Sequence, residues 1–425
     1  MSCDILVIIS DPHATKKTAY PDKDYQIKSS LMHFATAVAA VAALTISSSL
    51  VAASSQHVRS EAEAPSIRTY FYVGGEYVED ENGGHIFRDQ MYVEKLLPVG
   101  GATQDAPIVL IHGQAQTGSN FLNKPDGGRG WASLFISQGY EVYIVDQTFR
   151  GRSAWMPSYG AKQPSALSAE TIEKAFTATH KFNIWPQAVN HTQWPGTGLR
   201  GDPIFDAFYS ANVQFIDNST YQQAAVQAAG AALLDKIGRP VILLGHSQGS
   251  FMPILIADAR PALSKALILL EAGGPPFVDE IFVFGGENPR QWGLTDIPLT
   301  YEPAVTDPMV DIVKTRVTSK GEGYSDCTLQ ADDPQPRQLV NLLDKPILMI
   351  TGEASYHMPY DYCTANYLKQ AGCSKTEHVE LGDVGIHGNG HMMFMEKNSD
   401  EIQAFIERWI QSRFSLYTMD LPKTS

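Results

Sequence analysis

Hydrophobic and polar residues alternate along most of the chain in two recurring patterns. Short runs rich in Val, Ile and Leu recur, and such runs are typical of strands buried on both faces of a parallel sheet. They occupy residues 107–111, 141–145, 241–244, 266–270, 347–350 and 378–381. Between several of them the hydrophobic residues have helical spacing, as in residues 220–237, 365–370 and 399–411. This alternation predicts an α/β fold with a doubly wound, mostly parallel sheet.

A β-hairpin is predicted before the first of these strands. Residues 68–78 and 85–97 are strand-like, and the polar, glycine-containing residues 79–84 separate them. Residues 56–66 are polar and indicate a linker at the start of the folded part. We therefore expect one α/β domain over residues 56–425.

Two long segments, residues 154–219 and 273–345, interrupt the alternation of strands and helices. The first contains five prolines and the aromatic residues Trp155, Trp185 and Trp194. Long irregular insertions in a compact α/β domain are usually lids or binding loops. We therefore expect at least one of them to cover a functional site, with surface decoration as the alternative.

The N-terminal 55 residues have a composition of their own. A hydrophobic run from Phe34 to Ala53 follows Met32 and ends on small residues. This arrangement is typical of a secretory signal peptide. We predict a signal peptide at residues 32–55, a secreted protein, and an upstream stretch, residues 1–31, that is a gene-model extension. The alternative is an uncleaved membrane anchor, because twenty apolar residues can span a bilayer; the prevalence of Ala, Ser and Thr favours cleavage.

The cysteines indicate one disulfide in the secreted protein. Cys3 precedes the predicted signal peptide, which leaves Cys327, Cys363 and Cys373, and an oxidising compartment favours a disulfide among them. Residues 362–372 are predicted to be helical, and ten helical residues span about 15 Å. Bridged Cα atoms lie within about 7 Å, which disfavours a bridge between Cys363 and Cys373. Cys327 should pair with one of these two, and Cys363 is favoured.

Charge and motif content narrow the class of function. The net charge of −14 argues against nucleic-acid binding. Metal and phosphate motifs of the Cys-X2-Cys, His-Glu-X-X-His and P-loop types do not occur, so we predict no metal and no cofactor. Asn190 and Asn218 begin sequons and are predicted glycosylation sites, although a chain of this length carries one or two sequons by chance. A homodimer stays open.

The strongest candidate chemistry lies at Gly245-His246-Ser247-Gln248-Gly249. This Gly-X-Ser-X-Gly segment follows the predicted strand at 241–244 and precedes a hydrophobic helix at 251–257. In that context the serine lies on a tight turn with its hydroxyl exposed, and the glycines let backbone segments approach closely. We predict Ser247 as a nucleophile and the backbone N–H of Gln248 as a donor to the developing oxyanion. The alternative is a structural serine in a turn.

From Tyr70 to Phe414 the chain resembles the α/β-hydrolase superfamily, and within it a group of secreted fungal and bacterial carboxylesterases. The matching segments are Ile111-His-Gly-Gln-Ala-Gln-Thr-Gly118, Val145-Asp-Gln-Thr-Phe-Arg-Gly-Arg-Ser153, Gly245–Gly249, Leu270-Glu-Ala-Gly-Gly274, Thr351-Gly-Glu-Ala-Ser-Tyr-His357 and Gly388-Asn-Gly-His-Met-Met393. The resemblance implies a serine hydrolase that cleaves small-molecule carboxylic esters through an acyl-enzyme. The alternatives are acyl transfer, as in secondary-metabolite tailoring, and a non-catalytic binding protein of the same fold.

The resemblance also implies a second oxyanion donor and a general base. The donor comes from the turn after the strand at 107–111 and is the backbone N–H of Gln114, with His112 as a packing residue. The histidine comes last in the chain and is His391. His387 is then a loop histidine, and His357 is expected to line the pocket.

Two glutamates compete for the role of the acid. In most members of the superfamily the acid follows the seventh strand, where Glu353 stands. Glu271, however, ends the hydrophobic run at 266–270, and burying a carboxylate there is costly unless it is hydrogen-bonded. The esterases that the chain resembles place a glutamate at the matching spacing. We therefore predict Glu271, with Glu353 as the alternative and Asp383 as a third candidate.

Overall fold

The computed structural model describes residues 62–156, 165–282 and 289–414. All of them belong to one compact unit, residues 57–425. The predicted signal peptide at 32–55 and the upstream residues 1–31 lie outside the described residues, so both stay predictions. Among the residues that are described, no helix is long and apolar enough to cross a membrane.

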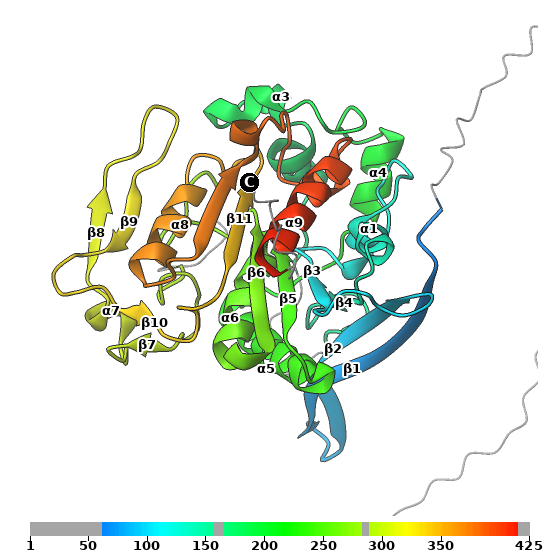
Figure 1. The fold of residues 1–425 in the computed structure, drawn as a ribbon, viewed down its shortest axis with the longest axis horizontal. Helices are drawn as coiled ribbons and strands as arrows, with labels where there is room; N and C mark the ends of the chain where they lie inside the picture. Colours follow the sequence, from blue (N-terminus) through cyan, green and yellow to red (C-terminus); the bar gives the residue numbers. More distant parts are fainter. Residues whose placement is uncertain (1–61, 157–164, 283–288, 415–425) are drawn as a thin grey trace, which may run out of the picture. The chain divides into compact units, whose positions relative to one another are not determined.

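An eight-stranded sheet forms the centre of the fold, with the strand order β1-β2-β4-β3-β5-β6-β11-β12 (Figure 1). The strands are β1 (Ser66–Glu79), β2 (His85–Pro98), β3 (Ile108–Ile111), β4 (Val142–Asp146), β5 (Val241–His246), β6 (Ser264–Leu270), β11 (Ile347–Thr351) and β12 (Thr376–Glu380). β1 and β2 form the predicted antiparallel hairpin, β2 runs antiparallel to β4, and the remaining neighbours are parallel. The predicted mostly parallel sheet is therefore confirmed.

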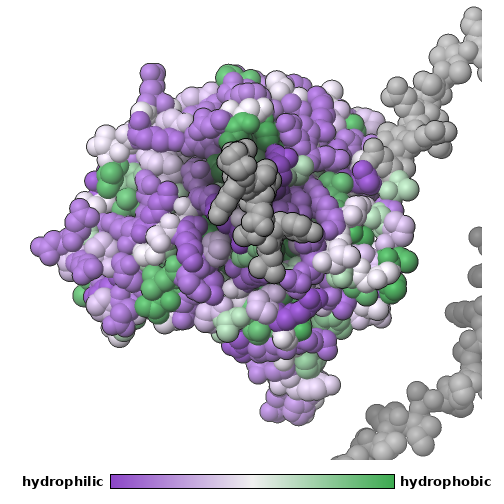
Figure 2. Space-filling model, viewed as in Figure 1, coloured by the Kyte–Doolittle hydropathy of each residue, from purple (hydrophilic) through white to green (hydrophobic). Residues whose placement is uncertain are grey.

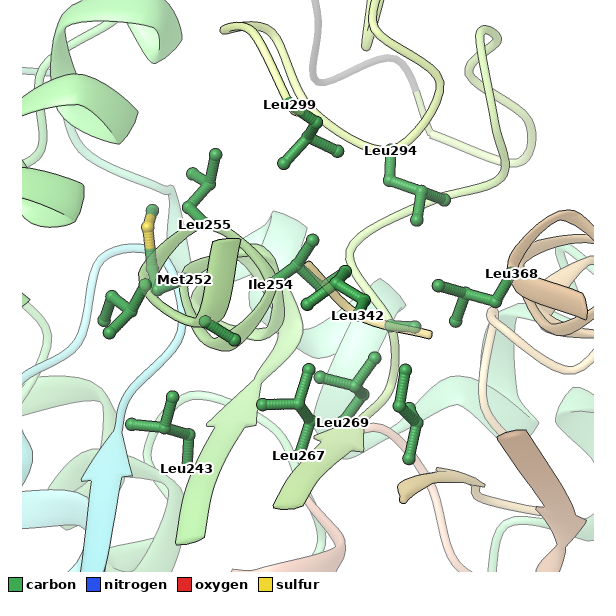
Figure 3. Packing of buried hydrophobic residues seen from close by; sticks show 14 of the residues in the cluster. Leu243, Met252, Ile254, Leu255, Leu267, Leu269, Leu294, Leu299, Leu342 and Leu368 are labelled. Carbon is green, nitrogen blue, oxygen red and sulfur yellow. The ribbon is translucent and has the colours of Figure 1, made fainter. Parts of the chain in front are cut away.

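Helices cover both faces of the sheet. They are α1 (Trp131–Ser137), α5 (Ser219–Ile237), α6 (Phe251–Ala259), α8 (Asp361–Gln370) and α9 (Ser399–Phe414). Because successive strand residues point to opposite faces, each buried strand contributes to two cores. Leu243 packs in the core with α5, α6 and α8, and Leu244 packs in the core with α1 and α9. Figure 3 shows the first core, where Leu267 and Leu269 of the sheet lie beneath Ile254 of α6.

The two irregular segments contain short elements. The first carries α2 (Ala169–Ile172), η2 (Glu173–Thr177), α3 (Thr179–Phe182), η3 (Pro186–Asn190) and α4 (Pro203–Ser210). The second carries β7 (Tyr301–Glu302), α7 (Pro308–Asp311), β8 (Lys314–Val317), β9 (Cys327–Gln330) and β10 (Gln338–Leu339). Both bury large side chains in the cores, such as Trp185 and Phe205 from the first and Leu294 and Leu342 from the second (Figure 3). They are therefore integral parts of the folded unit.

A disulfide joins Cys327 of β9 to Cys363 of α8, the pair that the sequence favours, with Cα atoms 5.3 Å apart. It ties the second irregular segment to a helix of the main fold. Cys373 is a buried free thiol, and burial raises its pKa to about 12. α8 ends at Gln370, so Cys373 lies beyond the helix that carries Cys363.

The surface is mostly hydrophilic on the face shown in Figure 2, where hydrophobic residues form separate small groups.

Both sequon asparagines, Asn190 and Asn218, are exposed. The side-chain oxygen of Asn218 accepts a hydrogen bond from the N–H of Tyr221 and thereby caps α5. Because glycosylation uses the side-chain nitrogen, this cap is compatible with the predicted modification.

Candidate active site

Ser247 lies on the sharp turn that links β5 to the 3-10 turn η4 (Ser247–Ser250) and to α6. Its φ of +55° is unusual for a residue other than glycine. The flanking glycines allow this turn to pack tightly. A Cβ on Gly249 would lie 2.1 Å from the carbonyl oxygen of His112, and one on Gly113 would lie 3.1 Å from the Cβ of Ser247. The turn that carries Gln114 therefore packs directly against the turn that carries Ser247.

His391 and Glu271 form a buried pair. The Nδ1 atom of His391 lies 3.1 Å from a carboxylate oxygen of Glu271, and both side chains are buried. Glu271 follows the end of β6 and has a φ of +54°. Its carboxylate also accepts hydrogen bonds from the N–H of Gly352, at 2.7 Å, and from the hydroxyl of Ser355. These three partners offset the cost of burying the carboxylate.

Glu353 and Asp383 lie elsewhere. Glu353 accepts hydrogen bonds from the N–H of Gly388, at 2.7 Å, and is paired with Nδ1 of His387 at 3.0 Å. His387 and Asp383 are exposed. The structure therefore brings Glu271 to His391 and Glu353 to His387.

Ser247 and His391 line a cavity whose wall has a hydrophobic and a polar part. The backbones or side chains of Gln114, Gln248 and Tyr356 line it as well. The hydrophobic part is Leu167, Phe176, Phe215, Ile216 and Phe251; the polar part includes Gln116, Arg150, Gln222, Gln223 and Arg290. Residues 154–219 and 273–345 both contribute to this wall. A ligand beside Ser247 would thus contact both irregular segments.

Burial sets the protonation of the buried pair. It lowers the pKa of His391 well below the ordinary value of 6.5, and nearby His246 and His357 act in the same direction. Burial also raises the pKa of Glu271, with the negative charge of Asp361 as the next cause. The hydrogen bonds from Ser355 and Gly352 oppose that rise. The neutral imidazole is therefore the stable form of His391, as a general base requires.

With His391 as the predicted general base, the acid limb of the pH–rate profile should reflect its lowered pKa. Since the imidazole must be neutral to accept a proton, activity is present above its pKa and is lost as the pH falls through it. We expect the midpoint of the acid limb of kcat/KM for an uncharged ester to lie well below 6.5, the ordinary pKa of an imidazole. Initial rates at constant ionic strength measure this profile.

The control for this profile is a return of each sample to neutral pH, which separates reversible titration from acid inactivation. An acid limb with its midpoint at or above 6.5, the ordinary pKa of an imidazole, would contradict the lowered pKa of His391.

Several residues near the pair were not predicted from the sequence. The Nε2 atom of His246 donates a hydrogen bond of 2.9 Å to the carbonyl oxygen of His391, and burial lowers the pKa of His246 to about 3. Tyr356 packs on the ring of His391, with centroids 4.8 Å apart, and lines the same cavity as Ser247. These contacts hold the backbone and the ring of His391 in place. The one signal for these two residues in the sequence is that His246 and Tyr356 lie within the segments that match the α/β-hydrolase superfamily.

His357 was expected to line the pocket, and this expectation is wrong. It is buried with its ring parallel to that of His391, with centroids 5.1 Å apart, and its Nδ1 atom lies 2.9 Å from Asp361. The spacing of four residues between His357 and Asp361 was a signal for this pairing. His112 is a buried packing residue, and burial lowers its pKa to about 4.

The potential metal ligands near the site take part in hydrogen bonds, although the buried Nε2 atom of His357 has no hydrogen-bond partner among the described residues. Atoms of Glu271, His357 and His391 lie within 4.8 Å of one another, and two histidines with one glutamate are a known zinc-binding set. However, Nδ1 of His391 pairs with Glu271, and Nδ1 of His357 pairs with Asp361. The hydrogen-bonded arrangement is that of an acid–base pair.

Comparisons with known proteins agree with this fold. Residues 108–405 match the model of the "Alpha/beta hydrolase family". The chain is 46% identical over 347 residues to a protein described as "Probable secreted lipase phiG" from Fungal sp. (strain ATCC 74256), which covers 82% of this chain and 90% of that protein. It is also similar in fold to a structure titled as a novel bacterial esterase, with a TM-score of 0.55 and 21% identity, over 83% of this chain and 97% of that one. The chain therefore belongs to the alpha/beta hydrolase family.

Proposed function

We propose that this protein is a secreted serine hydrolase that cleaves carboxylic esters of small molecules. The observation that carries the proposal is the buried hydrogen bond between His391 and Glu271, beside the turn of Ser247 in the same cavity wall. The relative at 46% identity is described as a probable secreted lipase, which supports an ester substrate.

The proposed mechanism has two steps through an acyl-enzyme. His391 accepts the proton of the Ser247 hydroxyl as the serine oxygen attacks the ester carbonyl, and the imidazolium returns that proton to the leaving alcohol. A water molecule then attacks the acyl-serine and gives its proton to His391; as the acyl–oxygen bond breaks, the imidazolium returns that proton to the oxygen of Ser247 and the carboxylic acid leaves. Glu271 orients the imidazole and stabilises its charged form.

The oxyanion of each tetrahedral intermediate accepts hydrogen bonds from the backbone N–H groups of Gln114 and Gln248. Gln248 follows Ser247 at the start of η4, where the first N–H groups of a helix have no partner within it. Gln114 lies in the turn that packs against Ser247 and lines the cavity. Donors fixed before the reaction stabilise the transition state without reorganisation.

Secretion is supported by three independent features. The disulfide between Cys327 and Cys363 suits an oxidising compartment. The predicted signal peptide at 32–55 and the two exposed sequons agree with export. Cleavage after the signal and glycosylation at Asn190 and Asn218 are part of the proposal.

An assay of product distribution distinguishes hydrolysis from acyl transfer. Purified protein is given a neutral p-nitrophenyl ester, and released acid and phenol are measured with and without an added primary alcohol. For a hydrolase we expect equal amounts of carboxylic acid and p-nitrophenol in water. With the alcohol present, we expect the free acid to remain the main acyl product. A new ester as the main product would support acyl transfer, and binding without turnover would support a non-catalytic protein.

A further inference from the structure

Arg150 is a buried cation in the wall of the cavity beside Ser247. Only 1% of its surface is exposed, and it lines the cavity. Burial lowers its pKa to about 9, which leaves it protonated at neutral pH. Buried charges are normally paired, yet among the residues that the structure describes no carboxylate forms an ion pair with Arg150, and its Nε atom has no hydrogen-bond partner. Its charge is therefore not neutralised locally.

The neighbouring Arg152 explains why Arg150 has no carboxylate partner. Arg152 forms an ion pair with Asp146, with Nε of Arg152 2.8 Å from a carboxylate oxygen, and a second ion pair with Glu94. Arg152 is also partly exposed. The two arginines of the loop after β4 thus differ in role: Arg152 makes a structural ion pair, and Arg150 points to the site.

Arg150 donates hydrogen bonds at both parts of the proposed oxyanion hole: to the peptide unit that carries the N–H of Gln114, and to the side chain of Gln248. Its Nη1 atom donates to the carbonyl oxygen of Gly113, at 2.8 Å, and to the side-chain oxygen of Gln248, at 3.3 Å. The carbonyl of Gly113 belongs to the same peptide unit as the N–H of Gln114. In a trans peptide these two groups point in opposite directions, so Arg150 binds one end of a dipole whose other end is the proposed donor.

We propose that Arg150 is a positioning residue for the oxyanion hole, an inference that rests on the proposed function. One guanidinium nitrogen links the turn of Gln114 to the side chain of Gln248. This link holds the backbone N–H groups of Gln114 and Gln248 at a fixed position relative to each other. Because hydrogen-bonded groups polarise one another, its bond to Gly113 strengthens the N–H of Gln114 as a donor. Its unpaired charge, acting in a low-dielectric site, also favours the negative charge that develops on the substrate.

A competing role for Arg150 is recognition of an anionic group on the substrate. Two carboxylates, Asp217 and Asp296, line the same cavity and would repel such a group. Asp296 accepts hydrogen bonds from Gln223 and from the N–H of Arg290, so its charge is fixed in place. The contacts of Arg150 with protein groups therefore favour positioning over substrate binding.

The test compares Arg150→Met and Arg150→Lys with the wild-type protein on two esters. One is neutral p-nitrophenyl acetate; the other is p-nitrophenyl succinate, which carries a carboxylate. Arg150→Met keeps the length of the side chain and removes the charge. We expect it to lower kcat by about 100-fold on both esters, with KM changed by less than about threefold, since the loss lies in the transition state. Arg150→Lys keeps the charge but loses the forked geometry, so we expect a loss of about tenfold in kcat.

The matched control is Arg152→Met, which removes the neighbouring arginine. It should lower the melting temperature because its ion pairs are lost, and it should keep kcat within about threefold on both esters. Melting temperatures show which variants are folded. If Arg150→Met does not fold, Arg150→Lys alone tests the inference, through its expected loss in kcat.

Two results would overturn the inference. An unchanged kcat in a folded Arg150 variant would remove the positioning role. A rise in KM confined to the succinate ester would make Arg150 a receptor for a substrate anion. If the wild-type protein hydrolysed neither ester while Ser247 stayed unreactive to a fluorophosphonate, the proposed function would fail and this inference with it; wild-type activity with normal Arg150 variants would refute the inference alone.

Discussion

Replacing Ser247 with alanine is expected to lower kcat for a short p-nitrophenyl ester by about 10⁵-fold or more. The substitution removes the hydroxyl that forms the acyl-enzyme, and His391 then has no nucleophile to activate. Steady-state rates of purified Ser247→Ala and wild-type protein measure the loss.

Ser250→Ala is the matched control for this substitution. Ser250 lies in the same 3-10 turn and is buried, and its hydroxyl accepts a hydrogen bond of 2.8 Å from the N–H of Gly273. Its loss should cost some stability and leave kcat within a few-fold of the wild-type value. Wild-type activity in a folded Ser247→Ala protein would show that another group is the nucleophile.

Glu271→Gln is expected to lower kcat by about 10³- to 10⁴-fold. The amide keeps the shape of the side chain but removes the negative charge that stabilises the imidazolium. Its NH2 group can also face Nδ1 of His391, which would favour the wrong tautomer. The Gly352 N–H and the Ser355 hydroxyl bind different carboxylate oxygens, so the amide oxygen can accept from only one of them. Melting temperatures therefore accompany the rates, and we expect the folded variant to keep its deficit in kcat.

Glu353→Gln provides the comparison that decides the acid. It weakens contacts with His387 and Gly388, which lie at a partly exposed position. We expect kcat to stay within about threefold of the wild-type value. A larger loss in Glu353→Gln than in Glu271→Gln, measured side by side, would assign the acid to Glu353.

The sheet could be predicted from the sequence because its strands are buried on both faces. Such strands are continuous runs of Val, Ile and Leu, as in β5 and β6, and they stand out from helical spacing. The hairpin of β1 and β2 was predictable from the polar turn between two strand-like segments. The irregular segments were not, since their structure depends on packing of residues such as Trp185 and Leu342 against distant parts of the fold.

The choice of acid was ambiguous in the sequence for a topological reason. Glu271 follows β6 and Glu353 follows β11, and these two strands are parallel neighbours in the sheet. Both carboxylates are therefore carried to the same edge, and strand order alone does not separate them. The side-chain contacts do: Glu271 meets His391, and Glu353 meets His387.

The surroundings of Ser247 needed the structure because they join segments far apart in the chain. His246 reaches the backbone of a residue 145 positions later, and Arg150 reaches the side chain of Gln248, 98 positions later. No local periodicity encodes such contacts. The Gly-X-Ser-X-Gly segment was recognisable because its requirement, a tight turn between a strand and a helix, is local.

Labelling with a fluorophosphonate probe tests the central claim, that Ser247 is an activated nucleophile, most directly. Wild-type protein and Ser247→Ala are treated with the probe at neutral pH, digested, and analysed by mass spectrometry. We predict one probe adduct per wild-type chain, located on the peptide that contains Ser247, and no adduct on Ser247→Ala. An unlabelled wild-type protein that is folded, or an adduct on a residue other than Ser247, would contradict this account.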